Sequence, residues 1–207
     1  MRPRSARRHA DAARRCGTAI GRCLESAAHL EAPDQRERPT VDDEGQYLEE
    51  TLLWLRRARA AFDSDTEYRY GLFEPGEQRL VGEVSLFKRV GPGAREIGYW
   101  IDRHLARRGL ATEAAAAMVR IAFEIDRVER VEIHHSADNT ASGAVPRRLG
   151  FTQDARLRRR SLDSDDVVRD LAIWTLFADE YPDSPASRVA IFAYDATGQA
   201  LQFDRSA

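Results

Sequence analysis

Lysine, cysteine and long apolar runs are the scarce features of this sequence of 207 residues. Lys88 is the only lysine among 32 basic residues, so arginine carries almost all of the positive charge. Two cysteines cannot build a disulfide framework, which favours a reducing compartment and predicts a cytoplasmic protein. No run approaches the roughly 18 apolar residues of a membrane-spanning helix, so the sequence predicts no membrane partner.

The overall balance of side chains is that of an ordinary globular domain. Hydrophobic residues make up 43% of the chain and charged residues 32%, and the formal net charge is −2. These values exclude a wholly disordered chain and a polycation of the nucleic-acid-binding type. A chain of this length fits one domain, which buries about 70% of the surface that its unfolded form exposes.

The N-terminus is rich in arginine, with six arginines among the first 15 residues. We expect residues 1–9 to form a basic arm, for which contact with nucleic acid or a ribosome is an open alternative. No apolar core of signal-peptide length follows the arm. A helix is expected over residues 10–29.

Apolar residues then recur at helical spacing, which predicts a second helix over residues 41–62. Its apolar stripe consists of Leu48, Leu52, Leu55, Ala58 and Phe62. Downstream, strand and helix patterns alternate. The expected elements are strands at 67–73, 79–88 and 95–101, a helix at 109–125, a strand marked by Val128, Val131 and Ile133, a helix at 139–149, and strands at 151–160 and 166–177. Long helices between strands need a sheet to cover, so the sequence predicts a mixed α/β domain.

The last part of the chain is expected to be an extension of this domain. Pro182 and Pro185 mark a linker, and the core strands are expected to end near Phe177. Residues 186–207 then form a C-terminal extension with a possible small hairpin, and we expect the fold not to need them.

One stretch of the sequence predicts an anion site. A strand that ends Glu96-Ile97-Gly98-Tyr99-Trp100-Ile101 is followed by Ala106-Arg107-Arg108-Gly109-Leu110-Ala111-Thr112-Glu113, where a helix begins. The first amides of a helix have no internal partners and carry partial positive charge. Gly109 lets a phosphate approach this backbone closely, and Arg107 and Arg108 add charge.

A second motif follows the next strand. It runs from Asn139 through Ser142 and Val145 to Leu149-Gly150-Phe151. Ser142 lies one helical turn after Asn139, so both side chains can face the same groove. From spacing alone, a surface or capping serine is the better interpretation.

Together the two motifs resemble the acetyl-CoA-binding core of the GNAT acetyltransferases, in the branch that includes the RimJ/RimL-type ribosomal-protein-alanine N-acetyltransferases. The late strand Arg169–Trp174 is in the place that this resemblance requires, and the resemblance covers residues 10–185. It implies a mostly antiparallel central sheet with helices on both faces, and acetyl-CoA as the co-substrate. The cofactor-binding residues that it implies are Tyr99, Ile101, Arg107, Arg108, Gly109, Leu110, Ala111, Thr112, Asn139 and Ser142.

The resemblance also implies catalytic roles. Ser142 is the candidate proton donor to the departing thiolate. Glu96 is the first candidate base and Glu83 the second, because a carboxylate on a strand beside the groove could deprotonate an amine through water. Residues 158–161 are basic, whereas ribosomal relatives have a carboxylate in the matching region.

No metal site is predicted. His134 and His135 are adjacent on a strand, so their side chains point to opposite faces and cannot form a compact pair of ligands. No spacing of cysteine and histidine is typical of zinc.

The sequence thus predicts an N-acetyltransferase whose acceptor is a primary amine, either a peptide N-terminus or a small molecule such as an amino sugar or an antibiotic. A catalytically silent acyl-CoA-binding module is the alternative from another class. The protein is expected to be a monomer or a homodimer.

Overall fold

The structure is a computed structural model that describes residues 15–16, 44–74, 79–162, 167–194, 199–200 and 203. The elements in chain order are strand β1 (Arg15–Cys16), helix α2 (Glu44–Asp63), strands β2 (Glu67–Phe73), β3 (Leu80–Phe87) and β4 (Ala94–Ile101), helix α3 (Leu110–Arg120), strand β5 (Arg130–Ser136), helix α4 (Thr140–Arg148), and strands β6 (Thr152–Leu162), β7 (Val168–Phe177) and β8 (Ala193–Tyr194). A π-helical segment, Ile121–Ile125, continues α3. In the described part of the chain, no helix is long and apolar enough to cross a membrane.

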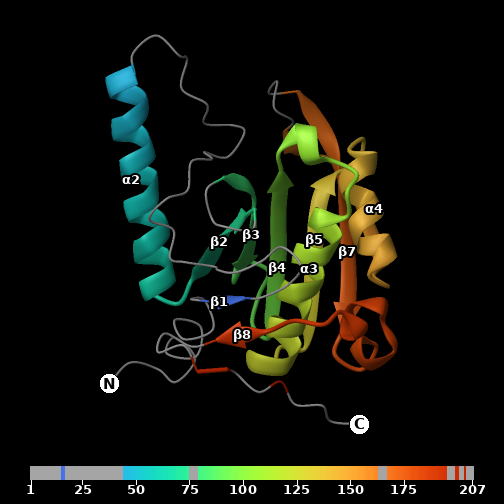
Figure 1. Ribbon diagram of the computed structural model, residues 1–207. Helices are drawn as coiled ribbons and strands as arrows, with labels where there is room; N and C mark the ends of the chain where they lie inside the picture. Colours follow the sequence, from blue (N-terminus) through green and yellow to red (C-terminus); the bar gives the residue numbers. More distant parts are fainter. Residues whose placement is uncertain are drawn as a thin grey trace.

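Six strands form one sheet in the order β2-β3-β4-β5-β7-β6 (Figure 1). The central pair β4 and β5 is parallel, and the other neighbours are antiparallel. Helix α3 lies in the crossover that two parallel strands require. The predicted mixed α/β fold with a mostly antiparallel sheet is confirmed, and the five strands with predicted bounds end within two residues of them.

The two faces of the sheet differ in what they carry. Side chains alternate along a strand, so Tyr99 and Ile101 of β4 point to one face, and Glu96 and Trp100 point to the other. Helices α3 and α4 cover the first face. Ile97 of β4 lies in the hydrophobic core with Met118 of α3, and the Tyr99 hydroxyl donates a hydrogen bond to Ser142 O of α4. We call it the α3/α4 face, and the other the opposite face.

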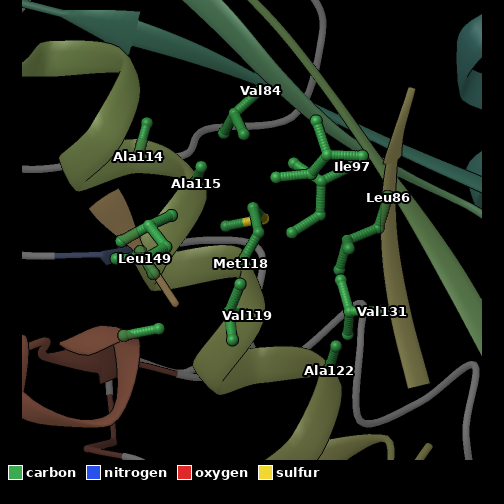
Figure 2. Close-up of a cluster of buried hydrophobic side chains, with 14 of the residues drawn as sticks. Val84, Leu86, Ile97, Ala114, Ala115, Met118, Val119, Ala122, Val131 and Leu149 are labelled. Atoms are coloured by element: carbon green, nitrogen blue, oxygen red, sulfur yellow. The ribbon is translucent and has the colours of Figure 1, made fainter. Parts of the chain in front are cut away.

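The hydrophobic core lies between the sheet and α3. Figure 2 shows Val84, Ile97 and Val131 of the sheet near Ala115 and Met118 of the helix. Four consecutive alanines, residues 114–117, are buried, and their small side chains allow the helix backbone to lie close to the sheet. Packing of this face positions the beginning of α3 at the end of β4.

Helix α2 lies beside the edge strand β2 (Figure 1). The Phe62 ring packs edge-to-face on Tyr68, with 5.3 Å between ring centroids. The Arg69 guanidinium lies 5.3 Å from the centroid of the Trp54 ring. Leu52, which the spacing placed on the buried stripe, is 45% exposed, so α2 contributes only part of that stripe to the core.

The expected helix over residues 10–29 is wrong at Arg15–Cys16, the only residues of that range that the structure describes. They form β1, which pairs antiparallel with Ala193–Tyr194 of β8. Their backbone therefore pairs with a distant strand instead of a helical turn, and local spacing cannot reveal such a partner. The expected arm, residues 1–9, lies outside the described residues.

The described part of residues 186–207 packs against the core. Ala186 and Ile191 are buried in the main hydrophobic cluster, and Arg120 Nη1 donates a hydrogen bond to Val189 O at 2.8 Å. An antiparallel bridge joins Tyr194 to Ala200. The expectation that the fold does not need this segment is therefore revised, while the boundary of the extension stays a prediction.

Replacement of Ile191 tests this packing. Ile191→Ala is expected to lower the free energy of unfolding by about 2–4 kcal/mol, because it leaves a cavity in the core. Phe192 is 62% exposed, so Phe192→Ala is the matched control, with an expected change below about 0.5 kcal/mol. Urea denaturation measures both values. Equal losses for the two variants would show that the segment does not pack as described.

Candidate active site

Strands β4 and β5 part in the middle of the sheet. Their register joins four residue pairs, from Ala94↔Arg130 to Ile97↔Ile133. Strand β4 continues to pair with β3 as far as Ile101, and β5 continues to pair with β7 as far as Ser136. Within these described strands, the residues beyond Ile97 and Ile133 are thus paired on their outer sides only. We call this unpaired stretch the β4–β5 gap.

Backbone donors of β4 point into this gap. The N–H of Asp102, directly after β4, donates to Val81 O of β3 at 2.9 Å. Successive peptide groups of a strand point to alternate edges, so the N–H groups of Tyr99 and Ile101 point toward β5. These are the two β4 residues predicted to bind the cofactor, and both amides are available to an acceptor placed in the gap.

Helix α3 begins with an open N-terminus near the end of β4. Its N-cap residue is Gly109, at φ 87°, a left-handed conformation that glycine adopts without a steric penalty. Helical bonding begins with Glu113 N–H to Gly109 O, so the amides of Leu110–Thr112 have no helical partner. Gly109 has no side chain to cap these amides, and the space where a Cβ would lie is open, with no atom within 4 Å. The arrangement suits an anion.

The loop before this terminus is positively charged. Arg107 and Arg108 are both exposed. Arg107 has φ 66°, a left-handed conformation that costs a residue with a Cβ about 1–2 kcal/mol. The strained turn brings the two predicted arginines to the open helix end, where their charge adds to that of the free amides.

Asn139 is the N-cap residue of α4. Its Oδ1 accepts a hydrogen bond from Ser142 N at 3.0 Å, so part of its role is structural. The Asn139 Nδ2 group stays available as a donor. Helix α4 therefore begins with two polar side chains, Asn139 and Ser142, one turn apart as the spacing predicted.

Ser142 and Tyr99 are joined by two hydrogen bonds. The Tyr99 hydroxyl donates to Ser142 O at 2.9 Å, and Ser142 Oγ donates to Tyr99 Oη at 3.2 Å. Pro146, four residues after Ser142, has no N–H to donate to Ser142 O. The Tyr99 hydroxyl thus takes the place of the missing N–H of Pro146 as the donor to Ser142 O. This bond attaches α4 to β4 beside the β4–β5 gap.

The Tyr99 hydroxyl stays protonated at neutral pH. Burial raises the pKa of Tyr99 from 10.0 to about 12, and the hydrogen bond with Ser142 offsets part of this shift. Each hydroxyl has one hydrogen, and both are used within the pair, so Ser142 Oγ–H becomes a donor beside the gap only when it turns away from Tyr99 Oη.

The two predicted bases are both paired with arginines on the opposite face. Glu96 is 5% exposed, and its two oxygens accept from Arg89 at 2.7 and 2.5 Å. Glu83 is 3% exposed, and its Oε1 accepts from Arg69 at 2.9 Å and from Ser85 at 2.7 Å. Both carboxylates are thus held by arginines, and of their four oxygens only Glu83 Oε2 has no hydrogen-bond partner among the described residues.

His134 is a candidate site residue that the sequence did not single out. Its Nε2 lies 2.7 Å from Glu132 Oε2, and its Nδ1 lies 3.8 Å from Glu96 Oε2. The signal was the spacing, since Glu132 and His134 are two apart on β5 and share a face. The two adjacent histidines point to opposite faces as predicted, and on the α3/α4 face His135 Nε2 accepts from Trp174 Nε1 at 3.0 Å. The described residues contain no group of three or more side chains able to hold a metal ion.

The contact between Tyr99 and α4 can be tested with a double-mutant cycle. Tyr99→Phe is expected to lower the free energy of unfolding by about 1–2 kcal/mol, because Ser142 O loses its partner. In a Pro146→Ala background the alanine N–H can bond to Ser142 O, so the same change should cost less, with a coupling energy of about 1 kcal/mol. Denaturant unfolding of the four proteins measures it. A coupling near zero would mean that Pro146 is not the reason for this bond.

Three curated bacterial proteins match part of the sequence, of which two are as follows. One is the probable N-acetyltransferase YjcK of Bacillus subtilis, 31% identical over 99 residues, which are 47% of this chain and 55% of that protein. The other is the ribosomal-protein-serine acetyltransferase of Escherichia coli, 30% identical over 91 residues, 43% of this chain and 50% of that protein. The chain thus spans about half the length of the curated relatives it matches.

A solved structure of Mycobacterium smegmatis RimJ in complex with CoA-disulfide has the same fold. It superposes with a TM-score of 0.61 and 24% identity, and covers 80% of this chain and 78% of that chain. Residues 27–152 match the family described as the acetyltransferase (GNAT) domain. This match takes in the parted strands, the open end of α3 and all of α4, and it spans more than half of the sequence. The chain belongs to the GNAT acetyltransferase family.

Proposed function

We propose that this protein is an acetyl-CoA-dependent N-acetyltransferase that transfers the acetyl group directly to a primary amine. The observation that carries the proposal is the β4–β5 gap beside the open N-terminus of α3. The gap offers the amides of Tyr99 and Ile101, and the helix end offers an anion site that a short loop joins to β4, with Gly109 as the N-cap residue. One long molecule with a polar thioester end and a phosphate end fits both.

The residues present fit coenzyme A. The amides of residues 110–112 would hold the pyrophosphate, with Arg107 and Arg108 as further positive charge, and the open space at Gly109 leaves room for it. Asn139 Nδ2 would donate to the pantetheine arm, and the Tyr99 and Ile101 amides to the arm and the thioester carbonyl. Acetyl-CoA, when bound, supplies an activated acetyl group. The CoA-disulfide complex of the structurally similar RimJ supports this assignment.

Ser142 and Tyr99 would assist departure of the sulfur. Transfer to an amine breaks the carbon–sulfur bond, and the negative charge that develops needs a hydrogen-bond donor. Ser142 Oγ–H would turn from Tyr99 Oη to the sulfur, while the Tyr99 hydroxyl keeps its bond to Ser142 O. A thiol has a pKa near 8.5, below the Tyr99 value of about 12, so complete proton transfer from the phenol is uphill. Assistance of this kind is expected at the low end of the usual range for acid catalysis.

Glu96 stays part of the proposed base, with His134 as the group that takes up the proton. Its oxygens are held by Arg89, and His134 lies between Glu96 and Glu132 on the same face. A proton released by the amine could pass to the imidazole, whose positive charge both carboxylates then stabilise. The three residues would serve as one unit on the side from which the amine arrives.

The acceptor is proposed to be the N-terminus of a protein, on the basis of the ribosomal-protein-serine acetyltransferase relative. A thiol-release assay tests the activity and the acceptor together, with peptides of varied N-terminus, polyamines and aminoglycosides. Turnover with small amines alone would favour a small-molecule acetyltransferase. Binding of acetyl-CoA without turnover of any amine would contradict the proposed activity and favour a binding module.

The phosphate site is tested by charge at Gly109. Gly109→Glu is expected to weaken CoA binding by about tenfold or more, because the carboxylate repels the pyrophosphate. Gly109→Gln is the matched control, with the same backbone strain and nearly the same bulk, and should bind more tightly than the glutamate variant. Isothermal titration calorimetry measures both. Equal affinities would place the phosphate elsewhere.

The role of Ser142 is tested by its rate effect. Ser142→Ala is expected to lower kcat by about 10²-fold or less and leave the affinity for acetyl-CoA nearly unchanged. Steady-state kinetics and a melting curve on the same variant separate three roles. Weaker binding with an unchanged kcat would make Ser142 a binding residue, and an unaltered kcat and affinity would remove it from the mechanism.

A further inference from the structure

Three buried polar side-chain atoms lack a hydrogen-bond partner in the part of the chain that the structure describes. They are Glu83 Oε2, Trp100 Nε1 and Ser136 Oγ. A buried polar atom without a partner costs free energy, and native proteins contain few of them. Three such atoms on the adjacent strands β3, β4 and β5 therefore call for an explanation.

The three atoms belong to one row of the sheet. Glu83 of β3 lies directly opposite Trp100 of β4, so their side chains share the opposite face. The register Glu96↔Glu132 puts the even-numbered residues of β5 on that same face, and continuing it by four residues aligns Ser136 with Trp100. Trp100 and Ser136 thus lie on the two sides of the β4–β5 gap, and Glu83 lies one strand away.

Of the two Glu83 carboxylate oxygens, Oε1 has two hydrogen-bond donors and Oε2 has none among the residues that the structure describes. Arg69 Nη1 and Ser85 Oγ both donate to Oε1, at 2.9 and 2.7 Å, and hold the carboxylate in place. Oε2 is an acceptor, Trp100 Nε1 can only donate, and Ser136 Oγ can do both. A ligand that satisfies all three atoms therefore has an N–H donor and an oxygen acceptor close together.

Resting on the proposed function, we infer that Glu83, Trp100 and Ser136 form the acceptor site, and that it selects amines with an oxygen on a neighbouring carbon. The amine donates to Glu83 Oε2, the ligand oxygen accepts from Trp100 Nε1, and Ser136 bonds to either group. The N-terminal residue of a peptide and a 2-amino sugar share this chemistry. A polyamine or a simple alkylamine has no oxygen and leaves Trp100 unpartnered.

The location agrees with the reaction geometry. Ser142 and Tyr99 lie on the α3/α4 face of the gap, and the unpartnered row lies on the opposite face with His134 and Glu96. An amine held there reaches the gap from the side that carries the proposed base. The sulfur leaves toward the side that carries the hydroxyl donors.

The decisive variant is Trp100→Phe, which removes the N–H and keeps an aromatic ring. Acetylation is measured by thiol release with an alanyl dipeptide amide, glucosamine, spermidine and n-butylamine. We expect kcat/KM to fall about tenfold for an oxygen-bearing amine, the loss of one hydrogen bond, and less than about twofold for n-butylamine and spermidine. A loss with the dipeptide alone assigns the site to peptides, and a loss with glucosamine alone assigns it to amino sugars. Equal losses for all four amines, or none, would overturn the inference.

Stability gives a second readout with a matched control. Trp100→Phe removes an unpartnered donor, so the urea midpoint should stay unchanged or rise. Trp174→Phe removes a donor that is bonded to His135, so its midpoint should fall. A fall in the Trp100→Phe midpoint equal to that of Trp174→Phe would show that Trp100 Nε1 has a partner in the free protein, such as an ordered water, and would contradict the site.

The test separates this inference from the proposed function. If the wild-type protein releases thiol with none of the four amines and with no other amine, the proposed activity itself fails. If the wild type acetylates these amines and Trp100→Phe leaves their ranking unchanged, the activity stands and only the acceptor site is wrong.

Discussion

Loss of pairing between the parallel strands β4 and β5 is the constraint on which the site depends. Four residue pairs join them, and beyond Ile97 and Ile133 each strand is held only by its outer neighbour. Burial of the α3/α4 face keeps both strands in place without those bonds, since Val84, Ile97 and Met118 are almost fully buried. The backbone groups that would have joined the two strands have no strand partner. A buried amide without a hydrogen-bond partner costs free energy, so these groups favour a bound ligand.

The gap also separates two kinds of chemistry. On one face, Pro146 withholds an N–H from Ser142 O, and Tyr99 takes its place, so a serine and a tyrosine hydroxyl are joined beside the gap. On the other face lie carboxylates, a histidine and the unpartnered row. An acetyl group in the gap would meet an amine on one side and lose its thiolate on the other. The proposed function and the proposed acceptor site both follow from this division.

The sequence predicted the parts of the fold that local patterns encode. Alternation and helical spacing gave the strands from 67 to 177 and both helices around the gap, and the glycine before Leu110 marked the open helix end. Long-range pairing was beyond local patterns, so Arg15–Cys16 was assigned to a helix and the packing of Ile191 was missed. The Tyr99–Ser142 contact and the row of Glu83, Trp100 and Ser136 depend on strand register, which spacing within one segment cannot supply.

The most direct test of the account is amide hydrogen exchange with and without coenzyme A, followed residue by residue by NMR. CoA is expected to slow exchange at Tyr99 and Ile101, whose N–H groups point into the gap, and at Leu110–Thr112. The amides of Gly98 and Trp100, which point toward β3, should change little. Protection at these two and none at Tyr99, Ile101 or the start of α3 would contradict the placement of the co-substrate between β4 and β5.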